Sequence, residues 1–193
     1  MDAVEIPGGR VLFKLDRFPD RRGSFREIYN KDRYGEHIPI HEWVQINHST
    51  SKKRTIRGLH YRENEAKLIT VIKGTIWDIT VDIKPESPTF GQWSKFLLNC
   101  DYQLYIPAGF AHGFEVISST DAEVVYYTNK TYDPSLSKGL AWNDPTLNIR
   151  WYTKHPRLSK QDGDNPSWKD IESNIGQTTF HVPSTMMVEG PKL

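Results

Sequence analysis

The chain has 193 residues, 37% of them apolar and 12% aromatic, and its 25 Lys and Arg nearly balance its 24 Asp and Glu. A formal charge of +1 excludes the broad basic surface that binds nucleic acid, and the single Cys100 excludes an intrachain disulfide. No apolar run is long enough to cross a bilayer and the N-terminus lacks a signal-peptide pattern, so we expect a cytoplasmic protein without a membrane partner. The length fits one domain, residues 1–175, followed by a C-terminal tail, residues 176–193.

Strand signals dominate the chain. Short β-branched or aromatic runs occupy residues 10–15, 68–72, 75–83, 95–98, 103–106 and 122–128, separated by turn-forming Pro and Gly. Lys73-Gly74 separates two of these runs as a tight hairpin would. Helical patterns are short, around residues 26–34 and 167–172, where Ser167 is a candidate N-cap. We therefore predict an all-β sandwich or jelly roll with a few short peripheral helices, and a poorly ordered tail from about residue 176.

The direction of side chains on two strands bears on function. Strand alternation puts Asp78, Thr80 and Asp82 on one face of a strand whose other face is apolar. In the run Ile56–Tyr61, the same alternation puts the side chains of Arg57 and His60 on opposite faces of the strand. A bulge at Gly58 would bring the two together, and the sequence alone leaves this open.

A series of short motifs occurs in order between about residues 10 and 170. They are Asp20–Glu27, Gln45–Ser49, Arg57–Tyr61, Lys67-Leu68, Val81–Ile83, Ser87–Gly91, Pro107–Phe114, Tyr132–Pro134 and Trp142–Pro145. Together they resemble the dTDP-4-dehydrorhamnose 3,5-epimerase family of sugar-nucleotide cupins. The resemblance implies a cupin-type double-stranded β-helix and a homodimer that exchanges strands near the N-terminus. It also implies a metal-independent epimerase without a cofactor.

The activity that the resemblance implies is inversion of C3 and C5 of dTDP-4-dehydro-6-deoxy-D-glucose to give dTDP-4-dehydro-L-rhamnose, in dTDP-L-rhamnose biosynthesis. The C4 ketone acidifies the protons on its flanking carbons, so this chemistry needs a base, an enolate stabiliser and an acid on the opposite face. The match to the family assigns His60 as the base and Tyr132 as the acid. Lys67 would stabilise the enolate, and Asp162, with Asp82 as the competing candidate, would orient His60.

The remaining candidates would bind the substrate. Arginine forks match phosphate oxygens, and an aromatic ring stacks on a base or sugar. The set comprises Arg22, Phe25, Glu27, Gln45, Asn47, Arg57, His112 and Asp82. If strands are exchanged, Arg22, Phe25 and Glu27 would serve the partner subunit's site.

Other interpretations of the same residues stay open. Taken alone, Asp162 fits a turn, Lys67 a solvated strand edge, and Arg22 with Glu27 an exposed pair. His60-Tyr61-Arg62 lacks the paired histidines of a metal-binding cupin, so we expect no required metal. The loop between Tyr61 and Lys67 is shorter than the family's and lacks its usual glutamine and proline. A single-centre epimerase on a related nucleotide 4-keto sugar, or a non-catalytic nucleotide-sugar-binding jelly roll, are the alternatives.

Overall fold

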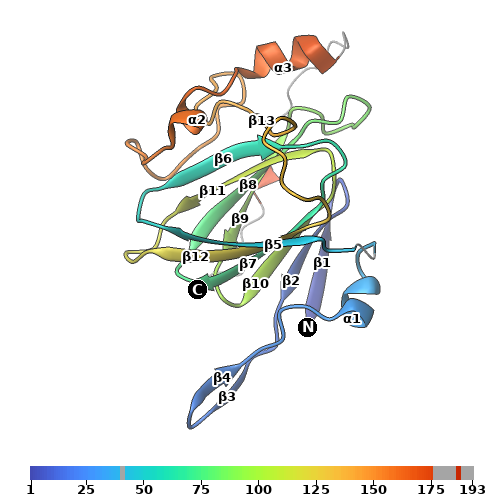
Figure 1. The fold of residues 1–193 in the computed structure, drawn as a ribbon, viewed down its shortest axis with the longest axis vertical. Helices are drawn as coiled ribbons and strands as arrows, with labels where there is room; N and C mark the ends of the chain where they lie inside the picture. The colour runs from blue at the N-terminus through green and yellow to red at the C-terminus, as the bar shows by residue number, and fades with distance from the viewer. Residues whose placement is uncertain (40–41, 176–185, 188–193) are drawn as a thin grey trace.

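The computed structural model describes residues 1–39, 42–175 and 186–187. Most of them form two six-stranded sheets packed face to face, with the helices at the periphery (Figure 1). The first sheet has the order β1 (Asp2–Ile6), β2 (Arg10–Lys14), β10 (Tyr102–Ile106), β7 (Lys67–Lys73), β12 (Ala122–Thr128), β5 (Gln45–Ser51). The second has the order β13 (Lys138–Gly139), β6 (Ile56–Tyr61), β11 (Phe110–Val116), β8 (Ile76–Asp82), β9 (Trp93–Leu98), β14 (Met186–Met187). The predicted all-β jelly roll is confirmed.

The predicted hairpin at Lys73-Gly74 is wrong. The strands on either side, β7 and β8, belong to different sheets, because β7 pairs with β10 and β12 while β8 pairs with β9 and β11. Gly74, with φ of +83°, turns a corner from one sheet to the other. A two-residue turn signal does not distinguish a hairpin from such a corner, since both need a positive φ.

The helices are short and carry clear caps. The side chain of Asn30 caps α1 (Lys31–Gly35), so the helix begins later than the predicted residues 26–34. At α3 (Trp168–Ile175), Ser167 and Asp170 bond each other reciprocally, which confirms the predicted start. The sequence did not predict α2 (Lys160–Gly163), whose N-cap is Ser159.

Three apolar clusters hold these layers together. One fills the gap between the sheets and includes Ile69, Phe114 and Val124. A second covers the outer face of the β6–β9 sheet beneath α3, with Leu59, Ile79, Val81 and Trp168 among its members, and a third lies beneath α1. Each fully buried Leu, Ile or Val contributes about 1.5–3 kcal/mol relative to exposure. Ile79 and Val81 therefore face outward, and their strand presents Asp78, Thr80 and Asp82 to the other side, as alternation predicts.

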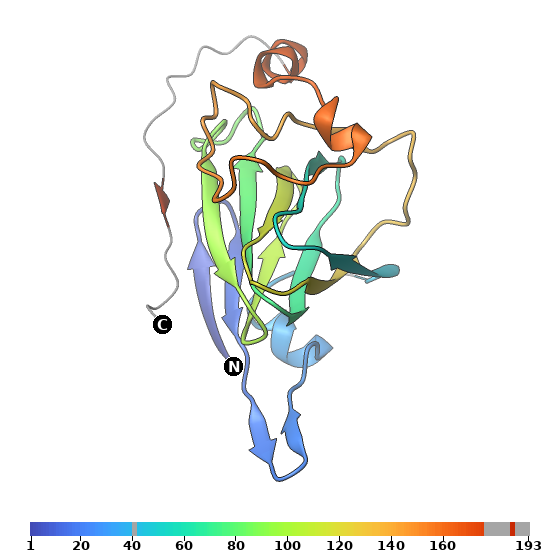
Figure 2. The same cartoon turned by 90° about the vertical axis from the view of Figure 1, so that its left-hand side faces the viewer.

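Two segments stand apart from the sandwich. A hairpin of β3 (Phe18–Asp20) and β4 (Gly23–Phe25) projects from one end, as Figures 1 and 2 show. At the other extreme of the chain, β14 lies parallel to β9, a pairing that the sequence did not predict. The rest of the predicted tail lies outside the described residues. Within the described part of the chain, no helix has the length and apolarity needed to cross a membrane.

Candidate active site

A cavity of about 530 Å³ opens between the two sheets, and we call it the central cavity. Its apolar floor includes Ile69, Phe114 and Val124 from the inter-sheet cluster, and its walls are polar. Strands β5, β7 and β12 supply one wall, β6 and β11 the other, and α2 lies at the rim. Eight of the residues predicted from the sequence line it: His60, Lys67, Tyr132, Asp162, Gln45, Asn47, Arg57 and His112.

His60 and Asp162 form a pair at this rim. Nε2 of His60 lies 2.6 Å from Oδ1 of Asp162, although the residues are 102 positions apart in the chain. The hydroxyl of Ser159 donates to the other carboxylate oxygen at 2.8 Å, and the Gly58 amide donates to Oδ1 at 3.3 Å. Burial opposes ionisation of Asp162, but these hydrogen bonds outweigh it and lower its pKa. The carboxylate thus stays ionised and fixes the orientation of the imidazole.

A bulge in β6 explains why Arg57 and His60 reach the same cavity. His112 of β11 lies opposite His60, whereas Phe114, two residues later, lies opposite Arg57, so β6 holds one extra residue. Gly58 sits at this irregularity with φ of +119°. The convergence that the sequence left open is therefore produced by the strand geometry.

Replacing Gly58 with alanine is expected to destabilise the fold by about 1–3 kcal/mol, because the new methyl group overpacks the sheet. A Cβ at this position would lie 2.6 Å from Cα of Gly113 and 2.8 Å from the carbonyl oxygen of His112. Urea unfolding would measure the loss. Gly163→Ala is the control, since no heavy atom lies within 4 Å of its added Cβ. Equal stability of the two variants would contradict the expectation.

A second histidine–carboxylate pair lies beside the first. Nε2 of His112 is 2.8 Å from Oδ2 of Asp78, and Asp78 is fully buried. Burial raises the pKa of Asp78, although the neighbouring His112 counteracts the rise. The other oxygen, Oδ1, has no hydrogen-bond partner among the described residues. Sequence reasoning placed Asp78 on the correct strand face but did not include it in the site.

Lys67 begins the central strand β7, and its side chain is mostly buried rather than solvated at a strand edge. Nζ lies 2.7 Å from Oε2 of Glu65, and both side chains are only 12% exposed. Glu65 also lines the cavity but was absent from the predicted site. The sequence signal for Glu65 is its position two residues before Lys67 in the shortened loop.

Three tyrosines line the cavity, Tyr61, Tyr126 and Tyr132, of which only Tyr132 was predicted as a site residue. Tyr132 lies at the mouth, 66% exposed, and its backbone amide donates to Oε1 of Gln45 at 2.6 Å. Gln45 in turn donates to Asn47 at 2.7 Å. Tyr126 on β12 is half-buried, and burial raises the pKa of its phenol while the charge of Arg57 opposes the rise. A phenol in that environment keeps its proton until a base takes it.

The hydrogen bonds of Arg57 orient its guanidinium in a way that suits an anionic ligand. Its guanidinium donates to the Ser51 hydroxyl at 2.7 Å and to the Thr50 carbonyl at 3.2 Å. Both acceptors are neutral, so these contacts orient the fork without cancelling its charge.

Asp82 does not join the site. It lies on the same strand face as Asp78, but its carboxylate accepts from Ser87 at 2.5 Å and from Thr89 at 2.6 Å. It also accepts from the Lys84 amide at 3.0 Å, so it fastens the turn after β8. Of the two carboxylates considered for pairing with His60, the structure places Asp162 in contact and Asp82 outside the cavity lining.

Comparison with known proteins places this fold and cavity in a family. The profile of the dTDP-4-dehydrorhamnose 3,5-epimerase family matches residues 4–170. The chain belongs to this family. The epimerase of Shigella flexneri is 39% identical over 175 residues, which cover 88% of this chain and 96% of that protein. The epimerase of Neisseria gonorrhoeae is 42% identical over 181 residues, but these cover 55% of it, so the chain spans about half the length of that relative.

A solved structure agrees with the assignment. The dTDP-6-deoxy-D-glucose-3,5-epimerase of Legionella pneumophila, in complex with dTDP-4-keto-L-rhamnose, has a TM-score of 0.85 and 33% identity to this chain. The alignment covers 90% of this chain and 96% of that one. The epimerase family thus accounts for the jelly roll and for the order of the motifs.

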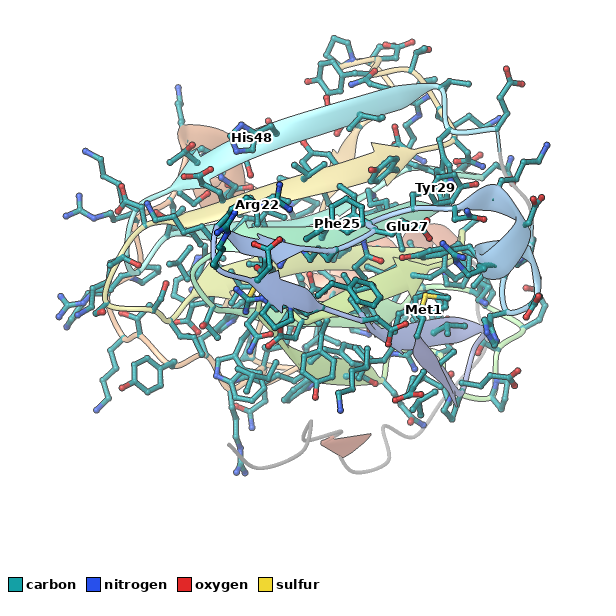
Figure 3. All side chains as sticks on the ribbon, turned by 90° about the horizontal axis from the view of Figure 1, so that it is seen from below. Met1, Arg22, Phe25, Glu27, Tyr29 and His48 are labelled. Atoms are coloured by element: carbon teal, nitrogen blue, oxygen red, sulfur yellow. The ribbon has the colours of Figure 1, made fainter. Side chains whose placement is uncertain are left out.

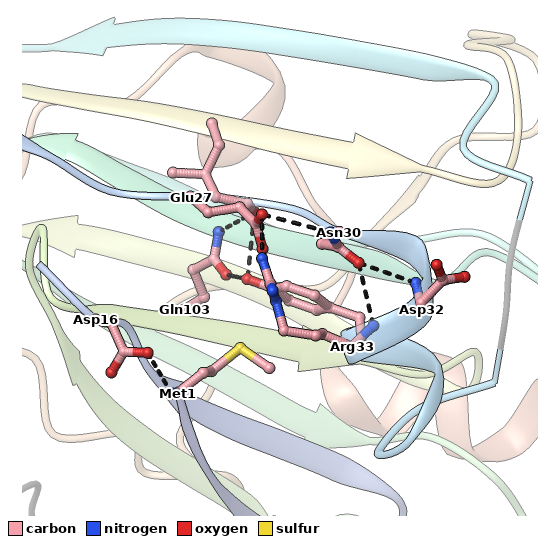
Figure 4. Close-up of polar contacts among 9 residues, drawn as sticks. Met1, Asp16, Glu27, Asn30, Asp32, Arg33 and Gln103 are labelled. Carbon is pink, nitrogen blue, oxygen red and sulfur yellow. Dashed lines mark hydrogen bonds and ion pairs between the residues drawn. The ribbon is translucent and has the colours of Figure 1, made fainter.

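Three residues predicted from the epimerase family do not reach the cavity of their own chain. Arg22 and Phe25 lie on the projecting hairpin, with Arg22's side chain 84% and Phe25 69% exposed, and Glu27 follows them (Figure 3). Arg22 bonds Asp20, and Glu27 bonds Arg33 of α1, as Figure 4 shows for the latter. Their role as substrate-binding residues stays a prediction that requires a second chain.

A larger open hollow of about 980 Å³ lies beside the central cavity and shares Tyr61, Arg62, Ser137 and Gln161 with it. None of its lining residues is a paired histidine or carboxylate of the site just described. Since epimerisation needs such groups, the smaller cavity is the candidate active site. In the described part of the chain, no three His, Cys, Asp or Glu residues gather as metal ligands would. The expected metal independence stays a prediction.

Proposed function

We propose that the chain converts dTDP-4-dehydro-6-deoxy-D-glucose to dTDP-4-dehydro-L-rhamnose by inverting C3 and C5, a step of dTDP-L-rhamnose biosynthesis. The observation that supports this most strongly is the His60–Asp162 pair, 2.6 Å apart, in a cavity that Tyr126, Tyr132 and Lys67 also line. A base, an acid and a cation in one enclosure are the groups that proton transfer next to a ketone requires.

His60 is the base in this mechanism. Because Nε2 faces the Asp162 carboxylate, the lone pair that takes the substrate proton is on Nδ1. Asp162 then stabilises the imidazolium that forms, and Ser159 keeps the carboxylate in place. The proton leaves the carbon next to the C4 ketone, and its electron pair moves to the carbonyl oxygen as an enolate.

Lys67 stabilises that enolate oxygen. Its ammonium lies in a partly desolvated cavity, so its attraction for the oxygen strengthens as negative charge develops there. His112 lines the same cavity, and its Nε2 is paired with the Asp78 carboxylate at 2.8 Å.

The acid on the opposite face is Tyr126 or Tyr132. The family match points to Tyr132, and the structure adds Tyr126. The half-buried position of Tyr126 favours it, because a fixed and shielded phenol delivers its proton without competition from water. Reprotonation from the face opposite His60 inverts the centre, whereas return of a proton by His60 restores it.

The nucleotide end is bound by Arg57, Gln45 and Asn47 from this chain. Arg57 offers a fork to the diphosphate, and the two amides provide neutral donors and acceptors. In a homodimer with exchanged N-terminal strands, the projecting hairpin would bring Arg22, Phe25 and Glu27 to the partner's cavity. The exposure of Phe25 is consistent with a ring that stacks on a ligand held elsewhere.

Incubation with the substrate in heavy water tests the proposal. We expect deuterium at both C3 and C5 and a product of inverted configuration, measured by NMR. Incorporation at one centre alone would identify a single-centre epimerase. Tight binding of the nucleotide sugar without any incorporation would identify a non-catalytic jelly roll and would overturn the proposal.

A further inference from the structure

The further inference concerns Glu65, a carboxylate inside the central cavity to which the mechanism assigns no part. Its Oε2 atom lies 2.7 Å from Nζ of Lys67, and each of the two side chains is 12% exposed. Both residues line the cavity. An ion pair at this depth is unlike a surface pair, because water screens it little and both partners have lost most of their hydration on burial.

The backbone around Glu65 is held firmly by one side chain. Asn129 accepts a hydrogen bond from the Ala66 amide at 2.8 Å and donates to the Asn64 carbonyl at 3.4 Å. Asn64 has φ of +58°, which completes the tight turn into β7. Glu65 is thus anchored by residues on both sides of it, and the carboxylate is presented to Lys67 from a fixed position.

Glu65 fits a pattern shared by three of the basic groups of the cavity. His60 has Asp162 at 2.6 Å, His112 has Asp78 at 2.8 Å, and Lys67 has Glu65 at 2.7 Å. A base that is held by its own carboxylate presents a defined atom to the substrate. Lys67 has a long, flexible stem, so it gains the most from such a partner.

We propose that Glu65 is a positioning residue for the epimerisation, which holds the Lys67 ammonium where the enolate oxygen develops. This inference rests on the proposed function for its chemistry, but the ion pair itself can be observed without substrate. Without Glu65, the Lys67 ammonium loses its fixed location, so stabilisation of the enolate falls while binding of the nucleotide persists.

Glu65→Gln tests the proposal, because glutamine keeps the size of the side chain and removes its charge. We expect kcat to fall by about 10- to 100-fold and KM to change by less than about threefold. Glu63→Gln is the matched control, since Glu63 is in the same turn, 81% exposed, and pairs with Lys138 instead. That variant is expected to keep the wild-type kcat.

A double-mutant cycle separates positioning from a general structural role. In the Lys67→Ala background, Glu65→Gln should cost no more than about a further twofold, because its target is gone. Equal losses in both backgrounds, or a wild-type kcat in Glu65→Gln alone, would overturn the proposal.

A readout without substrate distinguishes failure of this inference from failure of the proposed function. In the wild type, the Lys67 ammonium should give a resolved ¹⁵N–¹H NMR signal that is absent in Lys67→Ala, because a fixed ion pair protects its protons from exchange. The signal should be lost in Glu65→Gln and kept in Glu63→Gln. An inactive wild type that shows this pattern would reject the epimerase function alone, whereas a signal that survives in Glu65→Gln would reject the positioning role.

Discussion

Replacing His60 with asparagine is expected to lower kcat by about 10² to 10⁴-fold, the range typical of a lost general base. Asparagine can still bond the Asp162 carboxylate through its amide, so the rim of the cavity should keep its structure. Since the base acts in the transition state, the affinity for the nucleotide should change little. Deuterium incorporation at C3 and C5 should fall with kcat, because His60 is the group that takes the proton in the proposed mechanism.

Turnover, deuterium incorporation and calorimetric binding of dTDP would be measured together for this variant. His155→Asn serves as its control, since His155 is exposed and does not line the central cavity. A His60→Asn enzyme that retains more than about a tenth of the wild-type kcat would assign the base elsewhere.

Removal of the acid should have a different signature from removal of the base. In Tyr126→Phe, His60 can still take the proton and return a deuteron to the same face. We therefore expect continued exchange with solvent but loss of inversion by about 10² to 10³-fold. Phenylalanine keeps the ring and its packing on the cavity wall, so a change in exchange or inversion in this variant reports on the hydroxyl group alone.

Tyr132→Phe is the matched comparison, because Tyr132 lines the same cavity but is 66% exposed. We expect it to lose less inversion than Tyr126→Phe, since water can replace an acid at the mouth more readily than one in the wall. A larger loss in Tyr132→Phe, with normal inversion in Tyr126→Phe, would return the acid role to Tyr132. Exchange and inversion are measured in one NMR experiment, so both variants give an unambiguous ratio.

The pairing of His60 shows where sequence reasoning reached its limit. Two aspartates fitted the role from sequence: Asp82 lies on a strand, and Asp162 resembles a turn residue. In the structure, Asp162 of α2 contacts the imidazole of His60, although the two residues are 102 positions apart in the chain. Asp82 instead accepts hydrogen bonds from the Ser87 and Thr89 hydroxyls. Spacing in a sequence carries no information about such a long-range contact.

Strand alternation was the more dependable guide. It placed Asp78, Thr80 and Asp82 on one face, and the structure turns that face away from the outer apolar cluster. It did not reveal that Asp78 pairs with His112, because the partner comes from the neighbouring strand β11. Alternation predicts a direction, whereas a contact depends on the register between strands.

The sequence by itself determined that this chain is an all-β protein with the ordered motifs of an epimerase family, because strand periodicity and short motifs are local properties. Only the tertiary structure decided which groups meet in the cavity: Asp162 with His60, Asp78 with His112, and Glu65 with Lys67. In the same structure Asp82 bonds the Ser87 hydroxyl outside the site, and Arg22 lies on the projecting hairpin. The physical reason is that charges act over a few ångströms, and the β6 bulge, the sheet register and the caps of short helices set those distances.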